Sequence, residues 1–157
     1  MYKNKRIKLG FIGIGLMGRP MVIRLLMADY EVFAWNRSPE KLKEVVSAGA
    51  VPCESACEVA ANANIVLLCL ADGDAVTHVV TDKPFLDALS PDKILVDLSS
   101  IPPDTTLRTS ELIEKSTGAK WIDAPVSGGV PGAEQGTLVI MAGGEELAIE
   151  TVKPVLA

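Results

Sequence analysis

The feature that most constrains this chain is a glycine triplet between an apolar run and an amphipathic stretch. Gly13 ends the run 7–13, Gly15 and Gly18 follow it, and residues 16–28 repeat apolar side chains at helical spacing. The first glycine permits a tight turn, the second lets a phosphate approach the backbone, and the third lets helix and strand pack closely. The following helix start adds free N–H groups. The context predicts a β-α-β unit that binds a dinucleotide, the alternative being a glycine turn in an unrelated α/β fold.

The rest of the chain alternates short apolar runs with amphipathic stretches. Further strands are expected at 31–36, 65–70, 93–98, 121–124 and 138–142, and further helices at 38–48, 55–62, 74–89 (broken near Pro84), 102–115 and 145–155. Ser38 is expected to be a helix N-cap, because Pro39 and Glu40 follow it. Residues 125–137 are rich in glycine and proline and predict a loop. This alternation is typical of a doubly wound, mainly parallel α/β sheet, a Rossmann dinucleotide-binding domain spanning 1–157.

The second strand should end beside the ribose of a bound dinucleotide. Sites for NAD commonly place Asp or Glu there, about 20 residues beyond the glycines. This chain has Asn36, Arg37 and Ser38 instead, and Glu31 lies at the other end of the strand. A guanidinium can pair with a 2′-phosphate in a fork geometry, whereas a carboxylate would repel it. The sequence therefore predicts NADP with NAD possible, and the alternative is a solvated arginine in a loop.

Composition excludes several other functions. The net charge is −5 without a basic cluster, which argues against nucleic acid, and no apolar run is long enough to span a membrane. Residues 1–8 are basic but lack a signal-peptide cleavage site, so a cytoplasmic location is expected. Cys53, Cys57 and Cys69 suggest neither a disulfide framework nor a metal site, and we interpret them as small buried hydrophobes. The single histidine, His78, is expected on the surface of a helix.

Three blocks carry a resemblance to a known family. They are 10–21 (GFIGIGLMGRPM), 97–101 (DLSSI) and 123–129 (DAPVSGG), the last followed by a further Gly-Ala pair and Gly-Thr-Leu. The chain resembles the β-hydroxyacid dehydrogenase family, which includes 3-hydroxyisobutyrate dehydrogenase and tartronate semialdehyde (2-hydroxy-3-oxopropionate) reductase. The segment NRSPEKL in the second βα unit is similar to the NADP-using members.

The resemblance implies two sets of site residues. The cofactor would contact Gly13, Ile14, Gly15, Leu16, Met17, Gly18, Asn36, Arg37, Ser38, Leu70, Ala71 and Ser100. The substrate carboxylate would be held by Ser127, Gly128 and Gly129, where successive N–H groups can form an anion-binding concavity. Ala71 departs from the proline that is usual in the family. The alternatives are a plain surface turn for the glycines and helix capping for Ser99 or Ser100.

The resemblance also implies a catalytic lysine on a long helix beyond residue 157, leading into a helical second domain. No lysine of this chain lies in that motif. We therefore expect the cofactor half of an oxidoreductase that moves a hydride between NADP(H) and a small β-hydroxyacid or its semialdehyde. We expect it to be inactive alone and homo-oligomeric in its full-length form. The alternatives are a non-catalytic nucleotide-binding or interaction module and, more weakly, an S-adenosylmethionine site, which DAPVSGG argues against.

Overall fold

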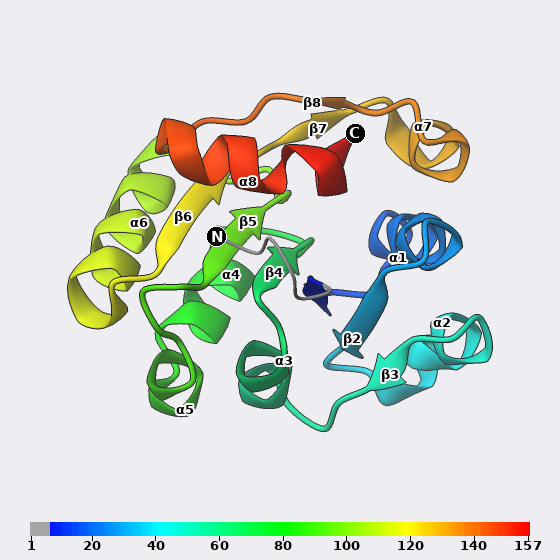
Figure 1. The fold of residues 1–157 in the computed structure, drawn as a ribbon, viewed down its shortest axis with the longest axis horizontal. Coiled ribbons are helices and arrows are strands. Elements are labelled where there is room, and N and C mark those ends of the chain that lie inside the picture. Colours follow the sequence, from blue (N-terminus) through cyan, green and yellow to red (C-terminus); the bar gives the residue numbers. More distant parts are fainter. Residues whose placement is uncertain (1–6) are drawn as a thin grey trace.

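A computed structural model describes residues 7–157, so most of the basic N-terminal segment lies outside the described residues. A central sheet has the order β3-β2-β1-β4-β5-β6, and all its neighbouring strands are parallel (Figure 1). The strands are β1 (Lys8–Ile12), β2 (Glu31–Trp35), β3 (Val51–Pro52), β4 (Ile65–Leu68), β5 (Ile94–Asp97) and β6 (Lys120–Asp123), and a separate antiparallel pair is β7 (Val126–Ser127) and β8 (Val139–Ile140). The prediction of a doubly wound, mainly parallel sheet is confirmed. Because the strand order reverses between β1 and β4, a crevice opens there at the carboxyl ends of the strands.

Helices cover both faces of this sheet (Figure 1). They are α1 (Gly18–Met27), a 3₁₀ turn η1 (Pro39–Leu42), α2 (Lys43–Ser47), α3 (Ala56–Asn62), α4 (Gly73–Val80), α5 (Lys83–Asp87), α6 (Pro103–Thr117), α7 (Gly129–Gln135) and α8 (Glu146–Leu156). One apolar cluster joins α1, α2 and α8 to the sheet, and a second joins α3, α4, α5 and α6 to the other face. Helix α7 packs against α1.

The central strands β4 and β5 are apolar except for the final Asp97 of β5, because both of their faces are covered. Every residue of β4 and of β5 is buried, including the final Asp97 of β5. Continuous apolar runs of this kind are characteristic of parallel sheets. On β1, a side chain at Gly10 would approach within 2.5 Å of the Val59 side chain, so glycine at this position lets α3 lie close to the strand.

The prediction of a loop at 125–137 is wrong. The segment contains β7 and α7, and its glycines mark the boundaries of these elements. Gly128 and Gly129 have φ values of 134° and 63° where the chain turns from β7 into α7, and Gly136 has φ of 69° where α7 ends. Because L side chains rarely adopt these angles, glycine is the residue that permits a strand and a helix to follow each other so closely.

Smaller differences occur at helix starts. The expected helix at 38–48 is divided into η1 and α2, and Ser38 occupies the N-cap position without a side-chain capping hydrogen bond. The expected break near Pro84 is present, but it lies at 81–82, between α4 and α5. The strand expected at 138–142 is shorter and pairs with β7, outside the parallel sheet. Strand β3 was not expected, because its two residues are exposed at the sheet edge.

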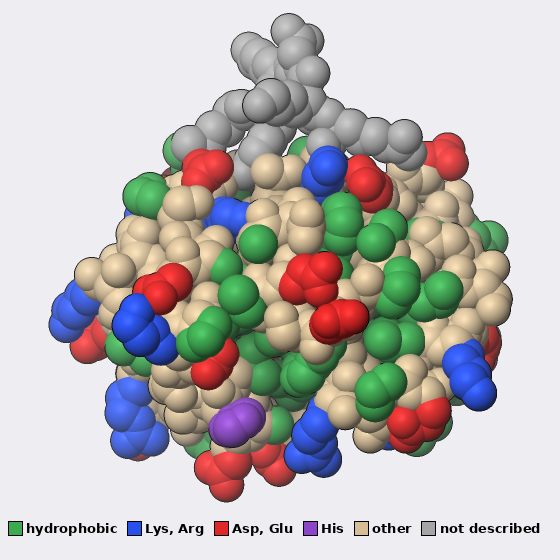
Figure 2. Space-filling model, turned by 90° about the horizontal axis from the view of Figure 1, so that it is seen from below, with side chains coloured by type: hydrophobic (Ala, Val, Ile, Leu, Met, Phe, Trp, Pro, Cys, Tyr) green, Lys and Arg blue, Asp and Glu red, His purple; other side chains and the backbone are tan. Residues whose placement is uncertain are grey.

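Cysteine and charge patterns also have structural counterparts. Cys53 is buried and Cys57 half-buried, and burial raises the pKa of the Cys53 and Cys69 thiols to about 11, which keeps them protonated. Within 7–157, no three metal-ligating side chains cluster, and no helix combines the length and apolar character needed to cross a bilayer. On the face drawn in Figure 2, basic and acidic side chains are interspersed around the edge, and further acidic side chains lie near the centre.

Candidate functional site

An open groove of about 520 Å³ lies at the carboxyl ends of β1, β2 and β4, beside the reversal in strand order. It brings together seven of the predicted cofactor residues, which are Gly13, Gly15, Asn36, Arg37, Ser38, Leu70 and Ala71. It is also lined by residues that the sequence had not singled out for this role, among them Trp35, Lys41, Cys69, Asp72, Asp74 and the exposed His78. Ile14, Leu16, Met17, Gly18 and Ser100 do not line this groove. A crevice at this point of an open α/β sheet is where such folds bind ligands.

The glycine turn after β1, which forms one wall of the groove, is held by hydrogen bonds from backbone N–H groups. The Gly13 N–H donates to the Trp35 carbonyl at 3.1 Å, and the Ile14 N–H donates to Asn36 Oδ1 at 2.8 Å. The Asn36 amide in turn donates to the Ser38 carbonyl at 3.0 Å. Asn36 therefore fixes the glycine turn against the end of β2, a role that the resemblance did not specify.

The three glycines of the motif face different surroundings. A Cβ on Gly13, whose φ is +103°, would lie 2.2 Å from the Cys69 carbonyl oxygen, and one on Gly18 would lie 2.0 Å from the Gly13 carbonyl oxygen. Both glycines are therefore required by packing. A Cβ on Gly15 would meet nothing within 4 Å, so at that position the backbone faces the open groove. Helix α1 begins without a side-chain cap and without an acidic residue in its first turn. The N–H groups at its start, next to Gly15, are therefore free.

Cations gather at the β2 end of the groove. Arg37 and Lys41 are exposed there, and no ion pair within residues 7–157 engages either of them. Asp72, on the α4 side of the groove, accepts the Ala75 N–H at 2.9 Å and caps that helix. Lys41 could have been suspected from the sequence, because it lies only four positions beyond Arg37 in NRSPEKL.

The wall formed by the β4–α4 connection is anchored to the end of β5. The Leu70 N–H donates to Ser99 Oγ at 2.9 Å, and the Ser99 N–H donates to Asp97 Oδ1 at 2.9 Å. Ser99 is buried, whereas Ser100 is exposed. The alternative that one of these serines caps the next helix is wrong, because Pro102 occupies the N-cap position of α6 and no side chain caps it.

The residues predicted to bind substrate lie on a separate, exposed segment. Ser127 ends β7, Gly128 is the N-cap of α7 and Gly129 is its first residue. A Cβ on Gly128 would lie 3.2 Å from the Leu138 side chain, so this turn rests on Leu138. These three residues do not line the groove at the carboxyl ends of β1, β2 and β4.

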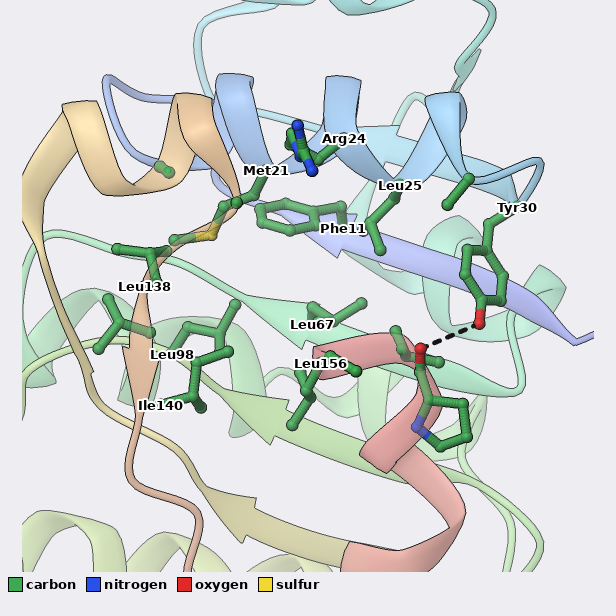
Figure 3. Close-up of a pocket in the computed structure, with 17 residues that line it drawn as sticks. Phe11, Met21, Arg24, Leu25, Tyr30, Leu67, Leu98, Leu138, Ile140 and Leu156 are labelled. Atoms are coloured by element: carbon green, nitrogen blue, oxygen red, sulfur yellow. Dashed lines mark hydrogen bonds between the residues drawn. The ribbon is translucent and has the colours of Figure 1, made fainter.

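A second cavity, of about 170 Å³, lies over the face of the sheet that α1 and α8 cover, between α1, α7, β8 and the end of α8. Figure 3 shows apolar side chains from these elements converging on it, with Arg24 and Tyr30 as its polar members. The Tyr30 hydroxyl donates to the Pro154 carbonyl at 3.3 Å, across one side of the cavity (Figure 3). This cavity is small and apolar, and it lacks the glycine turn and free helix N-terminus that a pyrophosphate requires.

Known proteins similar to this chain include a family of NAD binding domains. The family described as the NAD binding domain of 6-phosphogluconate dehydrogenase matches residues 8–157. The chain is 40% identical over 155 residues to 2-(hydroxymethyl)glutarate dehydrogenase of Eubacterium barkeri, covering 98% of this chain and 51% of that protein. It is 40% identical over 149 residues to 2-hydroxy-3-oxopropionate reductase of Escherichia coli K12, covering 94% and 50%.

Solved structures give the same result. Mycobacterium tuberculosis 3-hydroxyisobutyrate dehydrogenase with L-serine superimposes with a TM-score of 0.91 and 34% identity, over 96% of this chain and 50% of that one. Psf3 in complex with NADP⁺ and 2-OPP gives a TM-score of 0.89 and 34% identity, over 94% and 52%. The chain thus spans about half the length of the relatives it matches. It belongs to the family of the NAD binding domain of 6-phosphogluconate dehydrogenase, and the predicted kinship with the β-hydroxyacid dehydrogenases is confirmed.

Proposed function

We propose that the groove binds NADP(H) in preference to NAD(H). The observation that carries the proposal is the combination of a backbone open at Gly15 with two cations, Arg37 and Lys41, at the β2 end of the same groove. The pyrophosphate would lie against Gly15 and the start of α1, where N–H groups are free. The 2′-phosphate would lie between Arg37 and Lys41, since both can donate charge-assisted hydrogen bonds.

We further propose that the chain is the cofactor-binding part of an oxidoreductase acting on a small β-hydroxyacid or its semialdehyde. The names of the relatives support this class of substrate. A bound NADPH would supply the hydride, and the residues of the groove would orient it. The N–H groups of Gly128 and Gly129, in a turn with positive φ, suit a substrate carboxylate. The proton donor would be a lysine beyond residue 157, in keeping with the family resemblance.

Substitution of the two cations tests the cofactor preference. Arg37→Ala should weaken NADPH binding roughly 10- to 100-fold, because a hydrogen bond to a charged group contributes about 1.5–3 kcal/mol. Lys41→Ala should weaken it by a smaller factor, because an ammonium makes a single-point contact where a guanidinium can make two. NADH binding should change little in either variant, because NADH lacks the 2′-phosphate. Affinities are measured by calorimetric titration of both cofactors in parallel.

Lys43→Ala is the matched control, since Lys43 is an exposed lysine two positions beyond Lys41 and does not line the groove. It should leave the affinities for both cofactors unchanged. Equal affinity of the unmodified chain for NADPH and NADH, or an equal loss for both in Arg37→Ala, would show that the cations do not read the 2′-phosphate.

A further inference from the structure

A buried carboxyl group lies behind the groove wall. Asp97, the last residue of β5, is 0% exposed, and its Oδ2 atom has no hydrogen-bond partner within residues 7–157. Burial raises the pKa of Asp97 to about 6, and hydrogen bonds from the Ser99 side chain and N–H oppose this rise only in part. A buried carboxyl with an unpartnered oxygen is costly, so its presence needs an explanation.

The hydrogen bonds of Asp97 lead to the groove. Asp97 accepts hydrogen bonds from the N–H and the side chain of Ser99. Ser99 Oγ accepts the N–H of Leu70, which lines the groove together with Ala71. The pairing of β4 with β5 does not continue this far, because β4 ends at Leu68 and the last ladder hydrogen bond between the two strands is from the Leu98 N–H to the Leu68 carbonyl at 2.8 Å. The side chains of Ser99 and Asp97 therefore extend the connection between β4 and β5 beyond the sheet, to the residues of the wall.

We propose that Asp97 is a positioning residue for the dinucleotide, which acts through Ser99 to fix the Leu70 backbone and hence the groove wall. This inference rests on the proposed function, since it assumes that the groove holds the cofactor. Linked hydrogen bonds strengthen one another in a low-dielectric interior, so an ionised acceptor at the end of the series holds Leu70 more firmly than a neutral one.

The ionisable groups facing Asp97 come from the strands on either side. Asp123 of β6 is the register partner of Asp97, and its negative charge raises the pKa of Asp97. Cys69 lies directly after β4, and the charge of Asp97 in turn raises the pKa of the Cys69 thiol. From the helix layer, Thr106 of α6 lowers the pKa of Asp123, and its buried hydroxyl makes no hydrogen bond to Asp97 within residues 7–157. Ser99 is thus the group that stabilises the Asp97 carboxylate, and protonation of Asp97 loosens the same contact that holds Leu70.

The test is calorimetric titration of NADP⁺ between about pH 5 and pH 8 on the unmodified chain, Asp97→Asn, Asp97→Ala and Asp123→Asn. The 2′-phosphate of NADP⁺ itself titrates near pH 6, but this contribution cancels when variants are compared at each pH. On acidification, the unmodified chain should lose several-fold more affinity than Asp97→Asn, whose amide accepts from Ser99 at every pH. Asp97→Ala should bind about tenfold more weakly than Asp97→Asn at neutral pH, because it removes the acceptor. Asp123→Asn should shift the acidic loss of affinity to lower pH.

Circular dichroism on each variant separates loss of binding from loss of fold. If Asp97→Ala fails to fold, the comparison of Asp97→Asn with the unmodified chain decides alone. Identical pH profiles for these two proteins would overturn the positioning role while leaving the proposed function intact. Failure of the unmodified chain to bind NADP⁺ at any pH would instead overturn the proposed function.

Discussion

Substitution of Gly15 by valine should abolish cofactor binding and leave the fold intact. A Cβ at this position meets no protein atom within 4 Å, and Gly15 is not among the glycines with positive φ. The fold therefore has no need of glycine here, whereas a pyrophosphate lying on the backbone does. We expect affinity for NADPH to fall by at least about 100-fold, with circular dichroism and the thermal midpoint close to those of the unmodified chain.

Gly18→Val is the control that separates the two roles of the motif. Its Cβ would lie 2.0 Å from the Gly13 carbonyl oxygen, a backbone atom that cannot move aside without opening the turn. We expect this variant to lose roughly 3 kcal/mol or more of unfolding free energy. If Gly15→Val retained cofactor affinity, or if it unfolded as Gly18→Val should, the triplet would be only a structural turn.

The second large effect concerns the pH dependence of stability. Burial raises the pKa of Asp97 from its ordinary value of 3.8 to about 6, so the native state binds a proton more tightly than the unfolded chain does. The stabilisation of the fold that comes from this tighter proton binding is fully present below pH 3.8 and is lost as the pH rises through about 6. The side chain is completely buried, and the shift corresponds to about 3 kcal/mol of unfolding free energy.

Asp97→Asn removes this titration. Denaturant unfolding at a series of pH values should show that the unmodified chain loses about 3 kcal/mol more than Asp97→Asn between acid and neutral pH. The difference in slope is the informative quantity, because the buried amide of the variant brings its own constant cost at every pH. Parallel stability curves for the two proteins would mean that Asp97 titrates normally in the folded state.

The sheet could be predicted from the sequence because its central strands are covered on both faces. The runs at β1, β4 and β5 are apolar except for Lys8 at the start of β1 and Asp97 at the end of β5, and the glycine triplet marks the first turn, so local pattern and global fold agree there. The pattern failed at α7, where glycines at both ends suggested a loop but in fact permit an abrupt change from strand to helix. It also failed at the edge strand β3, whose two exposed residues have no apolar pattern.

The candidate site was predictable only in part, for a similar reason. The glycine turn and Arg37 are local features, and the structure brings them to one groove. The contact between Leu70 and Ser99 joins residues 29 positions apart, and the contact between Ile14 and Asn36 joins residues 22 apart. Such pairings depend on strand order and register, which a single sequence does not reveal. The anchoring roles of Asn36, Ser99 and Asp97 therefore emerged only from the fold.

The most direct test of the central claim is to locate bound NADP⁺ on the 157-residue chain by the shifts of its backbone amide resonances. We expect saturable shifts centred on the groove, at Gly13, Gly15, Leu70 and Ala71, with little change at Tyr30 and Leu156 beside the apolar cavity. An absence of saturable shifts, or shifts centred on the apolar cavity, would contradict the assignment of the groove as the dinucleotide site.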